Sequence, residues 1–175
     1  MKVIGLAGWS GAGKTTLLTQ IIPHFTAEGL RVSTVKHAHH KFDVDVPGKD
    51  SWRHRQAGAT EVLIASGRRW ALMHELRDNP EPRLTELLEK MARVDLLIVE
   101  GFKADSHPKI EVHRAANGRP FMYPDDSAIV GLVSDTKADT KLPFAHIDDI
   151  PAVARLVKAS AIKIEDLFAR EAAGA

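Results

Sequence analysis

A glycine-rich segment that ends in lysine and threonine carries the strongest chemical signal in this sequence. Residues 8–15 read Gly-Trp-Ser-Gly-Ala-Gly-Lys-Thr and directly follow a short apolar run at 3–7. Glycines in this pattern let consecutive backbone N–H groups curl around phosphates, while Lys14 adds a positive charge for the outer phosphates. The Thr15 hydroxyl is suited to magnesium. We therefore predict a phosphate-binding loop for a nucleoside triphosphate. Its expected contacts come from Trp9, Ser10, Gly11, Ala12, Gly13, Lys14, Thr15 and Thr16.

An acidic residue at the end of a second apolar run completes the chemistry expected of such a loop. Glu100 follows the unbroken run at 96–99. A carboxylate at the carboxyl end of a strand beside the first one holds magnesium directly or through water. Asp95, before the same run, lies about 17 Å away at roughly 3.3 Å per residue, so it cannot share the ion. We predict Lys14 and Glu100 as catalytic residues and Thr15 and Glu100 as magnesium ligands. The alternative is that Glu100 only ends the strand in solvent.

The segment Lys36–Asp50 is crowded with histidine, lysine and aspartate, and it follows the second expected strand. Loops after strands lie at the ligand-binding edge of an α/β sheet. We interpret this one as a switch-like loop that meets phosphate or an anionic substrate, with Asp43 or Asp45 joining the magnesium shell. The candidate residues, with one lysine from a later loop, are Lys36, His37, His39, His40, Asp43, Asp45 and Lys103.

Other interpretations of this segment stay open. His37 and His39 would share a strand face and could bind a transition metal, although no third ligand of the right kind is evident nearby. The segment could also be a polar surface loop. Within it, the alternating residues Phe42–Val46 favour an edge strand that pairs with another subunit.

A late loop contains a candidate for reading the base of the nucleotide. Guanine presents adjacent N–H donors that one carboxylate accepts together, whereas adenine offers no such pair. Residues 136–139 resemble a degenerate form of the guanine-reading motif Asn/Thr-Lys-x-Asp and follow the strand expected at 128–133. Asp139 is therefore a candidate guanine reader, although alternating charges are also typical of an ordinary solvated loop.

Apolar runs that alternate with helical spacing define the elements that must position these residues. Their order predicts an α/β fold, a three-layer phosphate-loop NTPase domain with a mainly parallel sheet and some antiparallel edge strands. The expected strands lie near 2–7, 31–36, 61–66, 70–74, 95–100, 109–114 and 128–133. The expected helices lie near 14–28, 50–58, 82–91 and 150–157.

Several single residues mark where these elements should end or turn. Pro23 is expected to kink or shorten the first helix, and Gly29 to end it. Asp148 or Asp149 is expected to cap the last helix. The strand at 70–74 is expected to form a hairpin with the strand before it.

Composition narrows the function classes. The 175 residues, 44% of them hydrophobic, suit a single domain over 1–175. The 24 basic and 23 acidic residues are interspersed without a basic stripe, which argues against nucleic acid as a partner. The absence of cysteine excludes disulfides and thiolate metal sites. Because no apolar run approaches membrane-spanning length or a secretory pattern, we expect a cytoplasmic protein away from membranes.

Several long strings of residues resemble the MobB family of molybdopterin-guanine dinucleotide biosynthesis adaptor proteins. The family pattern Ala-Trp-Ser-Gly-x-Gly-Lys-Thr-Thr matches residues 8–16 except that Gly8 replaces alanine, and Lys-His-x-His-His matches residues 36–40. Further matches lie at 43–45, 47–51, 57–59, 69–73 and 99–103. The family more usually has Ser-Asp after the late strand, which makes Asp135 a rival to Asp139 as the base reader.

The resemblance implies a homodimeric GTP-binding protein with weak GTPase activity that assists the guanylyltransferase MobA in attaching GMP to molybdopterin. It implies GTP and Mg²⁺ as ligands, with molybdopterin as a further candidate, and it implies that 8–16, 36–50 and 100–103 line one groove. Slow hydrolysis is expected because neither an arginine finger nor a water-orienting glutamine is evident beside Glu100. Arg53 and Arg55 are candidates for contributing in trans.

Two rival functions remain. One is a phosphate-loop kinase that phosphorylates a small molecule, with its acceptor bound near 36–41. The other is a metallochaperone GTPase that carries an ion on His37, His39 and His40.

Overall fold

The computed structural model describes residues 1–38 and 42–174. Two compact units divide the chain: the first consists of Met1–His37 and Leu87–Ala175, and the second of Ala38–Glu86. Compactness does not test whether the units fold independently, so the single domain over 1–175 stays a prediction. The helix α3 (Leu84–Glu89) spans the boundary between the units.

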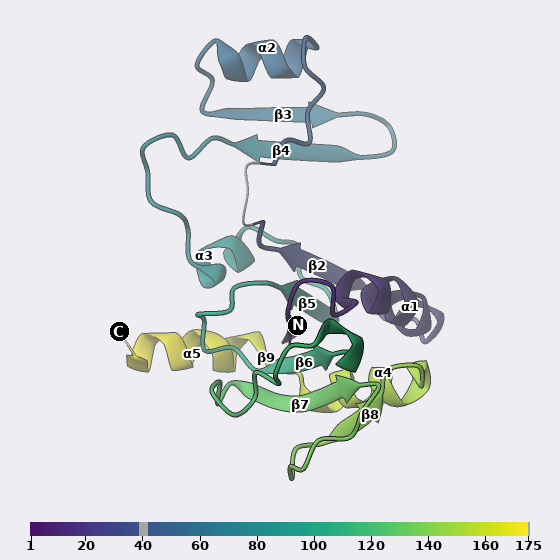
Figure 1. Cartoon of the computed structure of the whole chain (residues 1–175). Helices are drawn as coiled ribbons and strands as arrows, with labels where there is room; N and C mark the ends of the chain where they lie inside the picture. The colour runs from purple at the N-terminus through teal and green to yellow at the C-terminus, as the bar shows by residue number, and fades with distance from the viewer. Residues whose placement is uncertain (39–41, 175) are drawn as a thin grey trace. The chain divides into compact units, whose positions relative to one another are not determined.

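The first unit is built on a mainly parallel sheet, as predicted (Figure 1). Its strands lie in the order β2-β5-β1-β6-β7-β8, and every neighbouring pair along this path is parallel. The bounds are β1 Lys2–Ala7, β2 Val32–Lys36, β5 Leu96–Glu100, β6 Lys109–His113, β7 Ile129–Ser134 and β8 Phe144–His146. A short strand, β9 (Ile162–Lys163), pairs antiparallel with β1.

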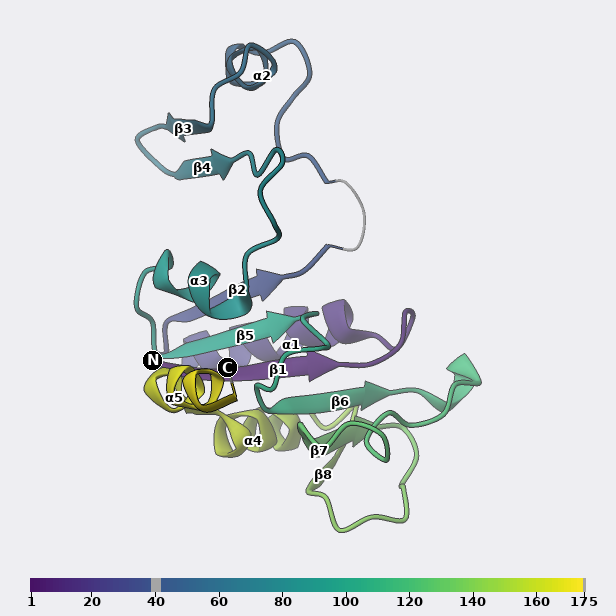
Figure 2. The same cartoon turned by 90° about the vertical axis from the view of Figure 1, so that its left-hand side faces the viewer.

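Helices cover both faces of this sheet. The helices α1 (Lys14–Ala27) and α4 (Ile150–Ser160) pack into one apolar core with residues of β1, β5 and β6. The helix α5 (Ile164–Gly174) lies on the opposite side of the sheet (Figures 1 and 2). The core includes Ile4, Leu6, Ile21, Phe25, Ile98 and Val153, all 0% or 1% exposed. Their burial supplies the hydrophobic stabilisation of the unit.

The helix signals in the sequence are mostly confirmed. Pro23 does not end α1, which continues to Ala27, so the predicted shortening is wrong. Gly29 follows the helix end with a φ of 82°, as expected of a residue that terminates a helix. Asp149 caps α4 because its carboxylate accepts a hydrogen bond from the Ala152 N–H.

The described residues of the second unit form the helix α2 (Asp50–Gln56), a hairpin and the first residues of α3. The helix α2 packs against β3 (Glu61–Ala65), and β3 pairs antiparallel with β4 (Trp70–His74). The predicted hairpin is confirmed, but it forms its own two-stranded sheet instead of an edge of the main one. The predicted edge strand at Phe42–Val46 is wrong, because these residues form no strand.

The parallel strands bring one set of loops together. Because all six strands of the main path point the same way, the segments after β1, β2, β5, β6 and β7 leave from the same edge of the sheet. We call this the carboxyl edge. The phosphate loop after β1, Glu100 at the end of β5 and Asp135 directly after β7 therefore lie at the same edge although they are far apart in the sequence.

Candidate functional site

The loop between β1 and α1 has the backbone that the phosphate-loop pattern requires. Gly8, Gly11 and Gly13 have φ angles of 142°, 81° and 89°, a range that side chains other than glycine rarely adopt. A Cβ on Gly8 would also stand 2.3 Å from the carbonyl oxygen of Val112 in β6. The glycines are therefore needed both for the turn and for its close approach to the sheet.

Lys14 lies over this loop at the start of α1. Its Nζ donates hydrogen bonds to the carbonyl oxygens of Gly8 at 2.7 Å and Trp9 at 3.1 Å. Burial lowers the pKa of the ammonium, the charge of Glu100 opposes this shift, and the charges of Lys103 and Lys36 add to it. A cation in this position favours an anionic ligand.

Glu100 lies at the end of β5 between the hydroxyl group of Thr15 and the amino group of Lys36. The Thr15 hydroxyl donates to Glu100 Oε1 at 3.5 Å, and Lys36 Nζ lies 3.8 Å from Glu100 Oε2. The strand register explains this, since Glu100 is paired with Leu6 in β1 and with Lys36 in β2. A carboxylate and a hydroxyl are hard oxygen donors, so this set fits magnesium, which also takes ligands from phosphates and water.

The turn after Glu100 holds His37 in a fixed position. The His37 N–H donates to the Glu100 carbonyl oxygen at 2.8 Å, and its ring stacks on Phe102 at a centroid distance of 4.7 Å. A Cβ on Gly101 would stand 2.6 Å from the His37 Cβ. Phe102 has a φ of 49°, which is strained for a bulky residue. The predicted residues His37 and Glu100 are thus brought together.

A segment that the sequence analysis did not single out also surrounds the phosphate loop. Residues 114–120 follow β6, and we call them the β6 loop. The amide of Asn117 donates to the Ser10 carbonyl oxygen at 3.0 Å, and Trp9 Nε1 donates to the Pro120 carbonyl oxygen at 2.8 Å. The Arg114 guanidinium lies beside Gly13. Two hydrogen bonds therefore join the β6 loop to the phosphate loop.

Two cations flank the indole of Trp9. Lys103 Nζ lies 5.7 Å and Arg119 Cζ 5.6 Å from the ring centroid, within the range of cation–π attraction. Trp9, Lys103 and Arg119 come from three different loops of the carboxyl edge. The positive charge around the phosphate loop therefore extends to the ring of Trp9.

The two candidate base readers differ in how they are held. Asp135 Oδ1 accepts a hydrogen bond from the Ala115 N–H at 2.9 Å, and this bond lowers the pKa of the carboxyl group. Asp135 thus anchors the β6 loop. Asp139 is exposed in the loop after β7, and its carbonyl oxygen accepts from the Tyr123 hydroxyl at 3.4 Å. Which of them reads a base stays a prediction.

The predicted magnesium roles of Asp43 and Asp45 conflict with their contacts inside the second unit. Arg55 NH2 lies 2.8 Å from both Asp43 oxygens, and Arg55 Nε lies 3.2 Å from Asp45 Oδ2. Asp45 also accepts from the Ser51 hydroxyl at 2.7 Å, and its side chain is 4% exposed. A magnesium ion would have to compete with Arg55 for both carboxylates and with Ser51 for Asp45, so these contacts do not support the predicted magnesium roles, which stay predictions.

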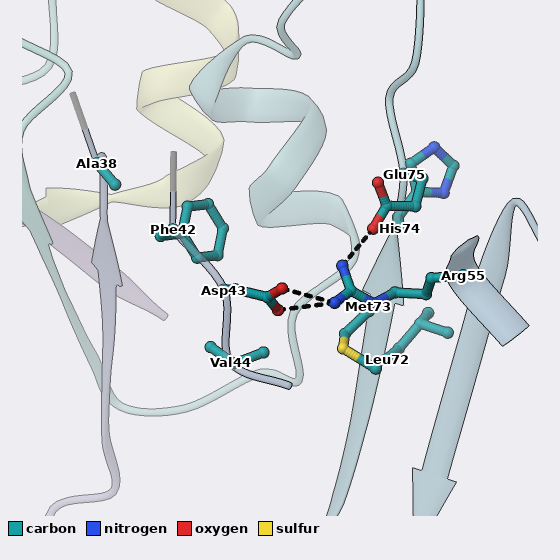
Figure 3. A pocket seen from close by; sticks show the side chains of 9 residues that line it. All are labelled: Ala38, Phe42, Asp43, Val44, Arg55, Leu72, Met73, His74 and Glu75. Carbon is teal, nitrogen blue, oxygen red and sulfur yellow. Dashed lines mark hydrogen bonds and ion pairs between the residues drawn. The ribbon is translucent and has the colours of Figure 1, made fainter. Parts of the chain in front are cut away.

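Arg55 is correspondingly unsuited to act in trans. A third contact joins its NH1 to Glu75 Oε1 at 2.7 Å, and hydrogen bonds to Asp43 and Glu75 raise its pKa far above the usual range. Figure 3 shows these residues along a cavity of about 800 Å³ in the second unit. The cavity is lined by Ala38, Phe42, Asp43, Val44, Arg55, Leu72, Met73, His74 and Glu75. No predicted nucleotide contact from residues 9–16 belongs to this lining.

A transition-metal site on the histidines of the segment Lys36–Asp50 receives no support from the described part of the chain. His39 and His40 lie outside the described residues. Among residues 1–38 and 42–174, no group of three or more His, Asp or Glu side chains is placed to hold a metal ion. In the same residues, no helix is long and apolar enough to cross a bilayer.

The strand order and the glycine-rich loop after β1 define a phosphate-loop type of α/β fold. The family described as "Molybdopterin guanine dinucleotide synthesis protein B" matches residues 3–135. The chain is 40% identical over 160 residues to the molybdopterin-guanine dinucleotide biosynthesis adapter protein of Escherichia coli, covering 90% of this chain and 91% of that protein. The corresponding Haemophilus influenzae protein is 38% identical over 161 residues, covering 90% and 88%. This chain belongs to the MobB family, and the resemblance seen in its motifs is confirmed.

Solved structures agree with this assignment. A crystal structure of molybdopterin-guanine biosynthesis protein B matches with a TM-score of 0.72 and 28% identity, covering 90% of this chain and 97% of that one. Bacillus subtilis MobB matches in fold, with a TM-score of 0.70 and 24% identity, covering 93% and 99%. The predicted α/β fold class is therefore confirmed.

Proposed function

We propose that this protein binds GTP with magnesium at the carboxyl edge of its first unit and hydrolyses it slowly, as an accessory factor in molybdopterin guanine dinucleotide synthesis. The observation that carries the proposal is the phosphate loop with Lys14 and the Thr15–Glu100 pair at its mouth. The relatives' names supply the pathway, since two of them are named adapter proteins of that biosynthesis.

The charge distribution supports an anionic ligand. Five cationic side chains surround the loop, namely Lys14, Lys36, Lys103, Arg114 and Arg119. Against them stand the carboxylates of Glu100 and Asp135. A triphosphate would relieve the repulsion among these cations, so binding should gain free energy from charge neutralisation.

Each residue at the mouth has a role in holding the triphosphate. The backbone N–H groups of Gly11–Lys14 cradle phosphate oxygens, and the Lys14 ammonium leaves its carbonyl partners to meet the outer phosphates. Thr15 and Glu100 would hold the magnesium ion, which neutralises charge on the phosphate oxygens when bound. The only glutamines of the chain are Gln20 and Gln56, so none follows Glu100 to orient a water, and turnover should be slow.

The carboxyl edge also has room in this proposal for a partner enzyme and a second ligand. We propose that the protein assists the guanylyltransferase MobA, and that the exposed cations Lys103 and Arg119 offer a place for an anionic group of molybdopterin beside the nucleotide. Both cations lie against the indole of Trp9 in the phosphate loop. A nucleotide and a second anionic ligand could therefore occupy the carboxyl edge together.

The second unit supports a homodimer. Among the described residues, the exposed large hydrophobic side chains all lie in this unit: Phe42, Val44, Val46, Leu63, Ile64, Trp70 and Leu72. Leu63 is paired with Leu72 and Ala65 with Trp70, so their side chains share one face of the hairpin. A two-stranded sheet needs further packing to be stable in water, and a second copy of the chain on this face would bury the side chains that α2 leaves exposed.

Calorimetric titration of GTP and ATP with magnesium tests the nucleotide assignment. We expect wild-type protein to bind GTP more tightly than ATP, and Lys14→Ala to weaken GTP binding by at least about 100-fold while the thermal unfolding curve is retained. Lys90→Ala, which removes an exposed lysine of the first unit, is the matched control and should bind as wild type does. Unchanged GTP binding by Lys14→Ala would refute the site.

A further inference from the structure

Arg114 lies beside Gly13 of the phosphate loop. Its Nε stands 3.2 Å from the position that a Cβ on Gly13 would occupy, and its Cζ stands 4.0 Å from it. Gly13 precedes Lys14, so the guanidinium is next to the backbone that cradles phosphates. Within the part of the chain that the structure describes, no carboxylate lies in ion-pair contact with Arg114, and its charge contributes only a minor part of the lowered pKa of Asp135. A guanidinium that faces a phosphate loop without an ion-pair partner is available to an anion.

Contacts of the residues before and after Arg114 hold its backbone in place. On one side, His113 Nδ1 lies 3.2 Å from the Ser134 hydroxyl and its ring stacks on Phe121 at 3.9 Å. On the other side, the Ala115 N–H donates to Asp135 Oδ1 at 2.9 Å. Further along, Asn117 donates to Ser10 of the phosphate loop itself. The backbone that carries the guanidinium is therefore fixed before any ligand arrives, which reduces the entropy lost on binding.

We propose that Arg114 is a phosphate-contacting residue that grips the inner phosphates of the nucleotide in the ground state. This inference rests on the proposed nucleotide site and assigns to it a residue from outside the loop motif. The part of a phosphate loop near Gly13 cradles the α- and β-phosphates, and a planar guanidinium donates two parallel hydrogen bonds to such oxygens.

The position of Arg114 separates its role from that of an arginine finger. A finger stabilises charge that develops on the transferred γ-phosphate and raises the hydrolysis rate. A cation on the inner phosphates binds GTP and GDP alike and leaves the rate of the bound nucleotide nearly unchanged. It also acts without regard to the base, because the phosphates are common to all nucleotides.

The test compares Arg114→Ala and Arg114→Lys with wild-type protein. Dissociation constants are measured for GTP, GDP, ATP and inorganic tripolyphosphate, and single-turnover hydrolysis is measured with GTP and magnesium at saturation. The control is Arg155→Ala, an exposed arginine of α4. Thermal unfolding verifies that each variant is folded, and Arg114→Lys serves if the alanine variant is not.

We expect Arg114→Ala to weaken all four ligands by about 10- to 100-fold, the loss of charge-assisted hydrogen bonds, with the single-turnover rate changed less than about threefold. Arg114→Lys should retain part of the affinity, because it keeps the positive charge but loses the paired N–H donors of the guanidinium. Unchanged affinity in both variants would overturn the proposal. So would a loss confined to GTP, or a fall in rate at constant affinity.

The outcomes also separate this inference from the proposed function. If wild-type protein binds ATP as tightly as GTP, the guanine assignment fails while the loss of tripolyphosphate binding in Arg114→Ala still supports the phosphate contact. If wild-type protein prefers GTP and Arg114→Ala binds it equally well, the proposed function stands and the contact is refuted.

Discussion

The two units of this chain distribute apolar and charged side chains in opposite ways. In the first unit, the sheet buries its apolar residues between helices, and its cations gather unpaired or loosely paired at the carboxyl edge. In the second unit, Arg55 pairs with three carboxylates, while Leu63, Trp70 and Leu72 are 61%, 69% and 47% exposed. Charges open to a ligand suit binding of an anion, whereas an open apolar face suits binding of another protein surface.

The largest expected difference between the units concerns truncation of apolar residues. Leu97 in β5 is 0% exposed, so Leu97→Ala should lower the free energy of unfolding by about 3 to 5 kcal/mol through lost burial and a cavity. Leu63→Ala, at an exposed position of β3, should cost less than about 0.5 kcal/mol in dilute monomeric protein. Urea denaturation of both variants measures this. Equal losses would mean that the second unit is packed like the first.

The first unit contains a buried histidine whose ring has no hydrogen-bond partner among the described residues. His107 is 0% exposed, and neither of its ring nitrogens has a hydrogen-bond partner among the described residues. Burial, with a smaller effect from the Lys109 charge, lowers its pKa from 6.5 to about 4. Protons therefore bind preferentially to the unfolded chain between these values, so this group makes stability fall as the pH drops from 6.5 towards 4.

We expect this contribution to reach about 3 kcal/mol at pH 4, the free-energy equivalent of the shift in pKa. The readout is the difference in unfolding free energy between wild-type protein and His107→Gln at pH 7, 5.5 and 4.5. That difference should shrink or reverse as the pH falls. His54→Gln, at an exposed position of α2, is the matched control. A His107 variant that follows the wild-type pH profile would contradict the prediction.

An intermediate effect is expected on self-association. Leu63→Lys places a charge on the exposed face of the hairpin and should weaken dimerisation by about tenfold or more, because the charge must be desolvated at an interface. Sedimentation equilibrium over a range of concentrations measures the dissociation constant. Gln20→Lys adds the same charge to the exposed side of α1 and should leave it unchanged. If the two variants behave alike, the apolar face is not the dimer contact.

The smallest expected effect separates two roles of Asp135. As an anchor of the β6 loop, its carboxylate can be replaced by an amide oxygen that still accepts from the Ala115 N–H. Asp135→Asn should then weaken GTP and ATP equally, by about threefold. If Asp135 instead reads the guanine base, Asp135→Asn should weaken the binding of GTP and leave the binding of ATP unchanged. Asp139→Asn, in the same loop, provides the comparison for both nucleotides.

Residues within continuous motifs were predictable from the sequence, and residues that meet through strand order were not. The loop at 8–15 and Glu100 follow from local patterns, since a glycine-rich turn after a buried strand has few other uses. Arg114 and Asn117 reach the loop only because β6 pairs with β1. No local pattern announces that pairing, which depends on the order of strands in the folded sheet.

The unsupported magnesium roles of Asp43 and Asp45 and the wrong strand at Phe42–Val46 have a related cause. An acidic residue in a loop fits a metal or a cation equally well, and the guanidinium of Arg55, which binds both carboxylates, comes from a helix later in the chain. Alternating apolar residues at 42–46 favour a strand only if a neighbouring strand offers hydrogen bonds. The sequence shows the side chains but not the partner that decides their role.

Hydrogen–deuterium exchange of the full chain with and without GTP and magnesium tests the central claim most directly. If nucleotide binds at the carboxyl edge of the first unit, amide exchange should slow at 8–16 and 113–120, and the exchange of β3 and β4 should change little. Lys14→Ala should show none of this protection. Protection confined to 50–75, with exchange at 8–16 unchanged, would contradict the assignment of the nucleotide to the first unit.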